Sequence, residues 1–183
     1  MAASSGKRVY RDLQQHIEEL KARDLLYVVD EPVNKDTEMS ALVRWQFRGG
    51  LREDQRKAFL FNNPTDSKGR QYDIPVVIGA LAANQDIYAT GMDTTVDGIA
   101  AKWSHAIANP IPPRLVNEAP CHDVVIEGED LVAEDGGLVR LPVPLSTPGF
   151  DSTPTLAATN VITKNPDTGT QNMGTYRAGL KAS

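Results

Sequence analysis

The sequence predicts a mixed fold of the α/β or α+β class, in which an N-terminal α/β layer domain precedes a β-rich region. Over residues 7–109, apolar residues with a helical period alternate with short runs rich in β-forming residues. Three prolines then fall within residues 110–113, where a helix cannot continue. No helical period follows residue 113, so the remainder is expected to consist of strands.

A first helix is expected over residues 10–22. Its apolar side chains recur every three or four residues and form one stripe: Val9, Leu13, Ile17 and Leu20. His16 lies off this stripe, so we interpret it as a surface histidine rather than a ligand. A short apolar strand is expected next, over residues 25–29, and Pro32 ends it.

A second helix is expected to begin at Asp36 or Thr37, because these residue types cap helices well. The pair Gly49 and Gly50 is expected to end it. Four apolar residues at helical spacing are predicted to face inward: Met39, Leu42, Val43 and Phe47. Trp45 on this helix is also assigned to the core, which leaves it without another role.

Two strands follow this helix. Residues 58–61 and 74–78 are rich in β-forming residues, and residues 62–64 form the turn after the first of them. The run 74–78 is almost entirely apolar, so this strand is expected to be buried on both faces.

Two helices complete the α/β region. Asn84 is expected to cap a short helix that ends near Thr90. Thr94 and Asp97 have the three-residue spacing of a capping box, which predicts a longer helix ending at Ala108. The inner side of this longer helix is predicted to comprise Val96, Ile99, Ala100, Trp103 and Ile107.

The proline-rich segment marks the expected domain division. Residues 1–109 form the α/β domain, residues 110–120 the linker, and residues 121–183 the first part of a β-rich domain. The strands expected in this last part cover residues 124–126, 138–141, 156–163 and 172–180.

Composition limits the class of protein. The chain has 183 residues, of which 40% are hydrophobic and 23% charged, as is typical of a globular protein. Its net charge of −5 argues against a general nucleic-acid partner. Neither an apolar signal segment nor a membrane-spanning run is present, so we expect a cytoplasmic protein without a membrane partner.

The segment 159–177 carries the clearest indication of chemistry. Two β-forming runs flank the sequence Asn-Pro-Asp-Thr-Gly at residues 165–169, which predicts a β-hairpin. Within the turn, Asp167 is expected to bond to nearby backbone and Gly169 to adopt a positive φ.

The returning strand has an unusual polar content. Asn172 offers a neutral carbonyl oxygen that suits a hard cation, and Arg177 offers a planar cation that suits a carboxylate or phosphate. These two residues are five apart, which places them on opposite faces of a regular strand. A shared site therefore requires a bulge or twist, and Gly174 is the expected place for it. Composition alone favours a solvated hairpin over a functional site.

The hairpin resembles the signature hairpin of the UbiD-type decarboxylases, which use prenylated FMN. The resemblance rests on the turn segment 161–169 and on the strand that follows it: Asn172, Met173, Gly174, Thr175, Tyr176 and Arg177. More diffusely, residues 30–33, 59–63 and 75–79 are similar to the N-terminal α/β domain of that family.

This resemblance implies an activity and a site. Family members remove carbon dioxide, often reversibly, from aromatic or α,β-unsaturated carboxylic acids, and they hold the cofactor in a split-barrel-like flavin-binding domain. Asn172 would bind a divalent metal, usually manganese, beside the cofactor phosphate, and a monovalent cation such as potassium is also implied. Arg177 would be catalytic, within a network with two glutamates beside the flavin. The backbone over residues 173–176 would line the cofactor.

The chain departs from the family pattern in its length. The remaining metal ligands and both catalytic glutamates of the family lie downstream of the hairpin, whereas this sequence ends six residues after Arg177. We therefore expect a second polypeptide to complete the enzyme, within a higher oligomer that acts on a small carboxylic acid. The alternatives are a truncated, non-catalytic paralogue that binds flavin phosphate, and a fragment cleaved from a longer parent.

Overall fold

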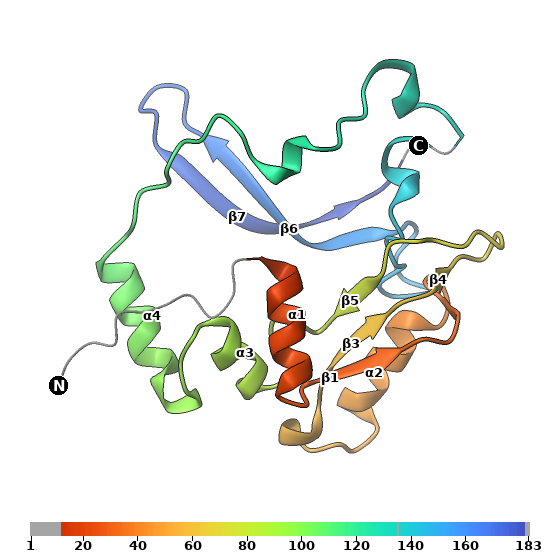
Figure 1. Ribbon diagram of the computed structural model, residues 1–183, viewed down its shortest axis with the longest axis horizontal. Coiled ribbons are helices and arrows are strands. Elements are labelled where there is room, and N and C mark those ends of the chain that lie inside the picture. Colours follow the sequence, from red (N-terminus) through yellow and green to blue (C-terminus); the bar gives the residue numbers. More distant parts are fainter. Residues whose placement is uncertain (1–11, 135, 182–183) are drawn as a thin grey trace. The chain divides into compact units, whose positions relative to one another are not determined.

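A computed structural model of the chain describes residues 12–134 and 136–181, and it confirms the predicted mixed α/β class (Figure 1). The sheets in this part are small, with strand orders β1-β3-β5, β2-β4 and β6-β7. The helices are α1 (Leu13–Ala22), α2 (Met39–Arg48), α3 (Gln85–Gly91) and α4 (Ile99–Ala108). The strands are β1 (Leu26–Val29), β2 (Val33–Asn34), β3 (Ala58–Phe61), β4 (Pro64–Thr65), β5 (Val76–Ile78), β6 (Thr155–Lys164) and β7 (Gln171–Gly179). Short 3₁₀ helices are η1 (Glu53–Gln55), η2 (Val96–Gly98), η3 (Pro120–His122), η4 (Gly128–Leu131) and η5 (Gly137–Arg140).

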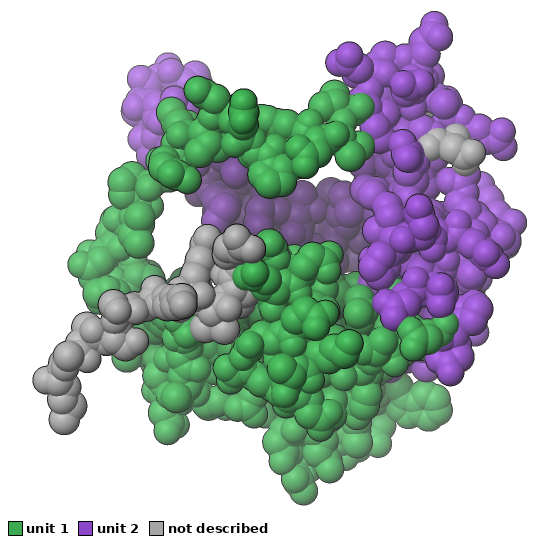
Figure 2. Space-filling view, viewed as in Figure 1, with its two compact units in different colours: residues 1–30, 43–61, 77–125 green, residues 31–42, 62–76, 126–183 purple. Residues whose placement is uncertain are grey.

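Contacts divide the chain into two compact units, coloured separately in Figure 2. The first unit contains residues 1–30, 43–61 and 77–125, and the second contains residues 31–42, 62–76 and 126–183. Each unit therefore joins segments that are far apart in sequence. The division expected at residues 110–120 stays a prediction.

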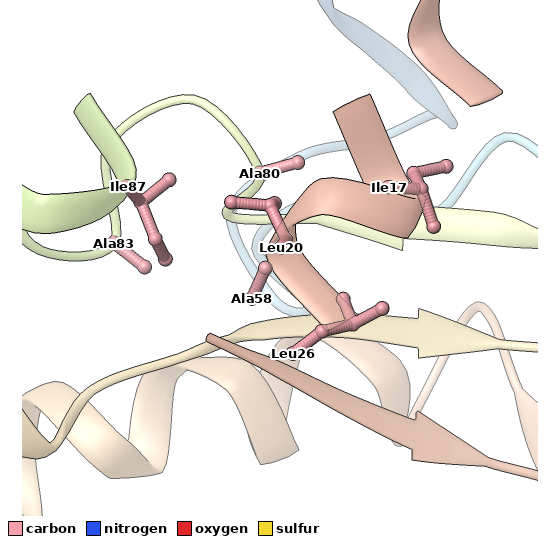
Figure 3. Close-up of a cluster of buried hydrophobic side chains, with 7 residues drawn as sticks. All are labelled: Ile17, Leu20, Leu26, Ala58, Ala80, Ala83 and Ile87. Carbon is pink, nitrogen blue, oxygen red and sulfur yellow. The ribbon is translucent and has the colours of Figure 1, made fainter. Parts of the chain in front are cut away.

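The core of the first unit is formed by helices α1 and α3 and by the first residues of strands β1 and β3. Strands β1 and β3 pair in parallel, with Leu26 opposite Ala58. Such a parallel pair needs a crossover connection, which here includes α2. The buried cluster, drawn in Figure 3, is formed by Ile17, Leu20, Leu26, Ala58, Ala80, Ala83 and Ile87. Leu20 and Ile87 are fully buried, and burying each such side chain stabilises the fold by about 1.5–3 kcal/mol.

Helix α1 confirms the predicted apolar stripe only in part. Asp12 caps it by accepting a hydrogen bond from the Gln15 amide at 3.0 Å. The interpretation of His16 as a surface residue is wrong, because only 2% of it is exposed and its Nε2 lies 2.7 Å from the Ala80 carbonyl oxygen. His16 is four residues before Leu20 and so shares its face, whereas Leu13 is 51% exposed. Val9 and Tyr10 lie outside the described residues.

Helix α2 ends before Gly49 as predicted, but its buried face differs from the expected one. Met39 and Val43 are buried, and so is Gln46, which bonds to both the amide and the carbonyl of Lys57. This face leaves three predicted core residues exposed, so that prediction is wrong for Leu42, Trp45 and Phe47. Ahead of the helix, Asn34 Oδ1 accepts the amides of Asp36 and Thr37, whereas the Asp36 carboxylate accepts the distant Ser67 amide.

Helix α3 confirms the predicted cap. The Asn84 Oδ1 accepts a hydrogen bond from the Ile87 amide at 2.7 Å, and its Nδ2 donates to the Arg56 carbonyl at 2.6 Å. Asn84 is 4% exposed, so both bonds lie inside the protein.

Helix α4 contradicts its predicted inner face. It begins at Ile99, after the 3₁₀ turn η2, rather than with a capping box at Thr94, and it contains no buried residue. Trp103 is 48% exposed and Ile107 is 75% exposed. The Trp103 indole donates to the Tyr88 hydroxyl at 2.7 Å, which satisfies its polar atom at the surface.

Two strands predicted after the linker are absent from the described part of the chain. Residues 124–126 have no strand partner, and residues 138–141 mostly belong to the 3₁₀ helix η5. In η5, the Val139 carbonyl accepts a hydrogen bond from Arg70 Nη1 at 3.1 Å. A side chain thus satisfies this backbone group in place of a strand partner.

The predicted hairpin is confirmed. Strands β6 and β7 pair antiparallel, and Gly169 has a φ of 71°. The turn differs from expectation in one respect, since Asn165 rather than Asp167 supplies the bonding side chain. Its Oδ1 accepts from the amides of Asp167 and Thr168 at 2.8 and 2.9 Å.

Every helix in the described residues is too short or too polar to cross a bilayer.

Candidate functional site

The candidate site residues lie on β7, whose pairing with β6 is regular over most of its length. Asn172 pairs with Thr163, and Gly174 pairs with Val161. The register shifts only between Leu156 and Thr159, where residues 157–158 lie opposite Arg177. The bulge therefore lies on β6 beside Arg177, and the expectation that Gly174 carries it is wrong.

This register separates the two polar ends of the candidate site. Along β7, side chains alternate between faces, so Asn172, Gly174 and Tyr176 share one face and Thr175 shares the other with Arg177. The Thr175 hydroxyl donates to Asn160 Oδ1 at 3.1 Å across the pair. The described chain thus does not bring Asn172 and Arg177 onto one face.

Gly174 is covered by a neighbouring ring. A Cβ placed on Gly174 would lie 2.5 Å from Tyr176 Cε2, so a larger residue would displace the tyrosine. The glycine therefore leaves a recess over the strand, as expected for a close approach to a ligand, but the Tyr176 ring occupies it. Tyr176 is itself 57% exposed and Met173 is 66% exposed.

Arg177 forms an ion pair with a residue that sequence analysis missed. Its Nη2 donates to both carboxylate oxygens of Asp151, at 3.0 and 3.1 Å. The Arg177 side chain is 57% exposed, whereas that of Asp151 is only 20% exposed. No local pattern could reveal this pair, because the two residues are 26 positions apart.

Asp151 also lines a cavity of about 1040 Å³ within the second unit. The cavity wall contains the buried Lys35, whose Nζ lies 2.7 Å from Asp36 Oδ1. Apolar side chains make up much of the remaining wall, among them Leu138, Val143 and Leu180. Charged and polar side chains make up the rest, so the wall is mixed rather than mainly apolar.

Asp66 and Tyr72 form a second polar cluster on this wall. Burial opposes ionisation of Asp66, but hydrogen bonds from the Arg70 and Lys68 amides and the Tyr72 hydroxyl outweigh it, so its pKa is lowered. Burial and the bond to Asp66 raise the pKa of Tyr72 to about 12. The phenol therefore stays neutral at physiological pH and acts as a donor. These hydrogen bonds hold the turn between Asp66 and Tyr72 in place.

The metal site that the resemblance implies is not assembled from the described residues. Asn172 is exposed on β7, and no group of three or more His, Cys, Asp or Glu side chains within residues 12–134 and 136–181 converges as metal ligands do. One amide oxygen is too few donors for a divalent cation. These residues therefore do not by themselves fit a manganese ion.

Comparisons with known proteins give consistent matches. The family model described as the 3-octaprenyl-4-hydroxybenzoate carboxy-lyase N-terminal domain matches residues 17–107. The model described as the Rift-related domain of the same carboxy-lyase matches residues 114–182.

Solved structures share the fold. The UbiD-class enzyme HmfF from Pelotomaculum thermopropionicum, in complex with FMN, is 29% identical with a TM-score of 0.70, over 90% of this chain and 33% of that chain. An evolved dimeric form of HmfF in complex with prFMN is 28% identical with a TM-score of 0.72, over 90% of this chain and 35% of that chain. Vanillic acid decarboxylase from Sedimentibacter hydroxybenzoicus, in open form, is 23% identical with a TM-score of 0.71, over 94% and 34%.

The chain spans about a third of the length of these solved proteins. The two family models leave only residues 108–113 of residues 17–182 unmatched, and the hairpin with Asn172 and Arg177 lies inside the second matched region. The chain therefore belongs to the UbiD family of carboxy-lyases.

Proposed function

We propose that this chain forms the N-terminal part of a prenylated-FMN-dependent decarboxylase that acts on aromatic or α,β-unsaturated carboxylic acids. The observation that carries the proposal is Arg177, a half-exposed guanidinium on the hairpin that bears the family motif. A guanidinium in this setting binds a carboxylate through charge-assisted hydrogen bonds. That chemistry supports a carboxylate substrate, and the aromatic or α,β-unsaturated class is proposed from the family resemblance alone.

The cofactor assignment draws support from HmfF, which was solved in complex with FMN and, in an evolved form, with prFMN. When bound, prenylated FMN would supply the electron sink for the loss of carbon dioxide, and the protein would supply binding and orientation. The β7 residues Met173, Gly174, Thr175 and Tyr176 would line it. Because the Tyr176 ring covers Gly174, that ring would have to move or to stack on the cofactor.

We further propose that Asn172 is one ligand of a divalent metal, with manganese as the expected ion, and that potassium is a second cation. The remaining metal ligands and the acidic catalytic residues would come from a second polypeptide in a higher oligomer. The division into an α/β domain, a linker at residues 110–120 and an incomplete flavin domain belongs to the same proposal.

The proposal is tested on the purified protein with any chain that accompanies it. Native mass spectrometry and an absorbance spectrum should reveal a partner chain and a bound flavin, and an aromatic acid should lose carbon dioxide. Arg177→Ala should lower kcat/KM by about 100-fold or more, as loss of a transition-state donor does. Arg52→Ala is the matched control, because Arg52 is also exposed and also paired, at 2.7 Å, with an aspartate, Asp54.

The control should remain within about twofold of the unmodified enzyme. A flavin-free species of 19.9 kDa without a partner would contradict the split-enzyme proposal and favour a non-catalytic binding module. Unchanged activity of Arg177→Ala in an active complex would instead overturn the role of Arg177.

A further inference from the structure

The ion pair between Asp151 and Arg177 uses one nitrogen of the guanidinium. Both carboxylate oxygens accept from Nη2, at 3.0 and 3.1 Å. Among the described residues, Asp151 alone accepts hydrogen bonds from the Arg177 side chain. The donors on Nε and Nη1 are therefore left for another acceptor, on a side chain that is 57% exposed.

Asp151 is held by the loop that leads into β6. The amides of Asp151 and Phe150 both donate to the Thr147 carbonyl, at 2.9 and 3.0 Å. Two residues after Asp151, the Thr153 hydroxyl donates to the carbonyl of Leu180. The Leu180 amide returns a bond to the Pro154 carbonyl at 2.9 Å. This loop is thus fastened to the chain just beyond Arg177, so the aspartate has a fixed place relative to β7.

The bulge on β6 lies opposite the same arginine. Residues 157–158 face the single position of Arg177, whereas the ladder from Tyr176 back to Gln171 is regular. Bulges of this kind re-aim a side chain and often lie next to functional sites. The β6 bulge therefore lies opposite Arg177, and the carboxylate of Asp151 binds the guanidinium of the same residue.

We propose that Asp151 is a positioning residue for Arg177: it anchors the guanidinium through Nη2 and leaves Nε and Nη1 to bind the substrate carboxylate. This inference rests on the proposed function, in which Arg177 binds that carboxylate. The less exposed Asp151 provides the fixed point, and the more exposed Arg177 meets the ligand. Asp151 also places a negative charge beside the site, which weakens the attraction of Arg177 for any anion.

Steady-state kinetics distinguish the two effects of Asp151, which are the anchoring of Arg177 and the negative charge beside the site. Asp151→Asn keeps the shape but removes the charge, so the guanidinium attracts an anionic substrate more strongly while it is held less firmly. We expect KM to stay the same or to fall, and kcat to fall about 10- to 100-fold, as for loss of a residue that orients a catalytic group. Asp151→Glu restores the charge and should recover part of kcat. A merely structural role would change protein yield and thermal stability without this split.

The experiment measures kcat, KM and flavin content of the complete enzyme carrying Asp151→Asn or Asp151→Glu. Asp167→Asn is the matched control, because it is the same substitution in the exposed turn of the same hairpin. In parallel, the Nε–H signal of Arg177 is followed by NMR in the full ¹⁵N-labelled chain, with Arg177→Lys to assign it. Asp151→Asn should broaden or shift this signal, and Asp167→Asn should leave it in place.

Each outcome bears on one of the two proposals. If Asp151→Asn leaves kcat within twofold while Arg177→Ala abolishes turnover, the positioning role is overturned and the proposed function stands. If the Arg177 signal does not respond to Asp151→Asn, the positioning role is overturned whether or not the protein is active. If Arg177→Ala is fully active, the proposed function fails, even though the NMR response still reports the ion pair.

Discussion

The core of the first unit and the β6–β7 hairpin of the second unit are organised in opposite ways. The core cluster buries Leu20 and Ile87 completely between α1, α3 and the sheet. The hairpin is longer than any other paired strands in the described chain, yet Ile162 and Met173, which pair with each other, are each more than 60% exposed. A two-stranded ribbon of this kind contributes little stability by itself. The family motif thus lies on a strand, β7, that has no buried residue.

The largest expected effect tests the core side of this comparison. Leu20→Ala removes a fully buried side chain from the centre of the cluster and should lower the free energy of unfolding by about 2–5 kcal/mol. Leu13→Ala is the matched control, on the same helix at a side chain that is 51% exposed, and should change it by no more than about 0.5 kcal/mol. Urea denaturation of the chain followed by circular dichroism measures both values. Equal losses would show that α1 packs through a different face.

The regular elements were predictable where their signals are local. The α3 cap at Asn84 and the turn glycine Gly169 follow from residues within a few positions, so both were located correctly. His16 lies four residues before Leu20 on the buried face, but the Ala80 carbonyl that pairs with its ring lies 64 residues away, so its burial was missed. The strand expected at residues 138–141 failed for a similar reason, since Arg70 supplies the hydrogen bond to Val139 from 69 residues away.

An intermediate effect tests whether the cap at Asn84 acts through one bond or two. Asn84→Ala removes both the bond to the Ile87 amide and the bond to the Arg56 carbonyl, and it should cost about 1.5–3 kcal/mol. Asp12→Ala removes an exposed cap from α1 and should cost about 0.5–1 kcal/mol. Asn84→Asp separates the two bonds, because it keeps the acceptor for Ile87 but loses the donor to Arg56. If Asn84→Asp is as stable as the unmodified chain, the bond to Arg56 contributes nothing.

The candidate site shows the same limit of local patterns. The hairpin motif identifies Asn172 and Arg177, and their spacing correctly predicts opposite faces of a regular strand. The bulge position and the partner of Arg177 were not predictable, because both depend on residues that precede the turn, in β6 and in the loop before it. A local motif thus identifies the side chains that carry the chemistry. Tertiary packing decides which distant groups hold those side chains in place.

The smallest expected effect tests the hairpin side of the comparison. Met173→Ala should change the free energy of unfolding of the chain by no more than about 0.5 kcal/mol, because the side chain is 66% exposed. Met39→Ala is the same substitution at a fully buried position and should cost about 2–5 kcal/mol. Denaturation of the chain alone measures both. A loss above about 1 kcal/mol for Met173→Ala would mean that the hairpin face is already covered in the chain in solution.

The same variant also reports on the proposed assembly. If a second polypeptide covers the hairpin, Met173 becomes buried in the complex, and Met173→Ala should weaken association about tenfold while leaving the chain itself stable. Association is measured by titration of the partner chain, with Leu13→Ala as the exposed control in the first unit. Unchanged association would leave the hairpin face solvated in the complete enzyme, and Ile162, which pairs with Met173, would then be expected to tolerate a polar residue equally well.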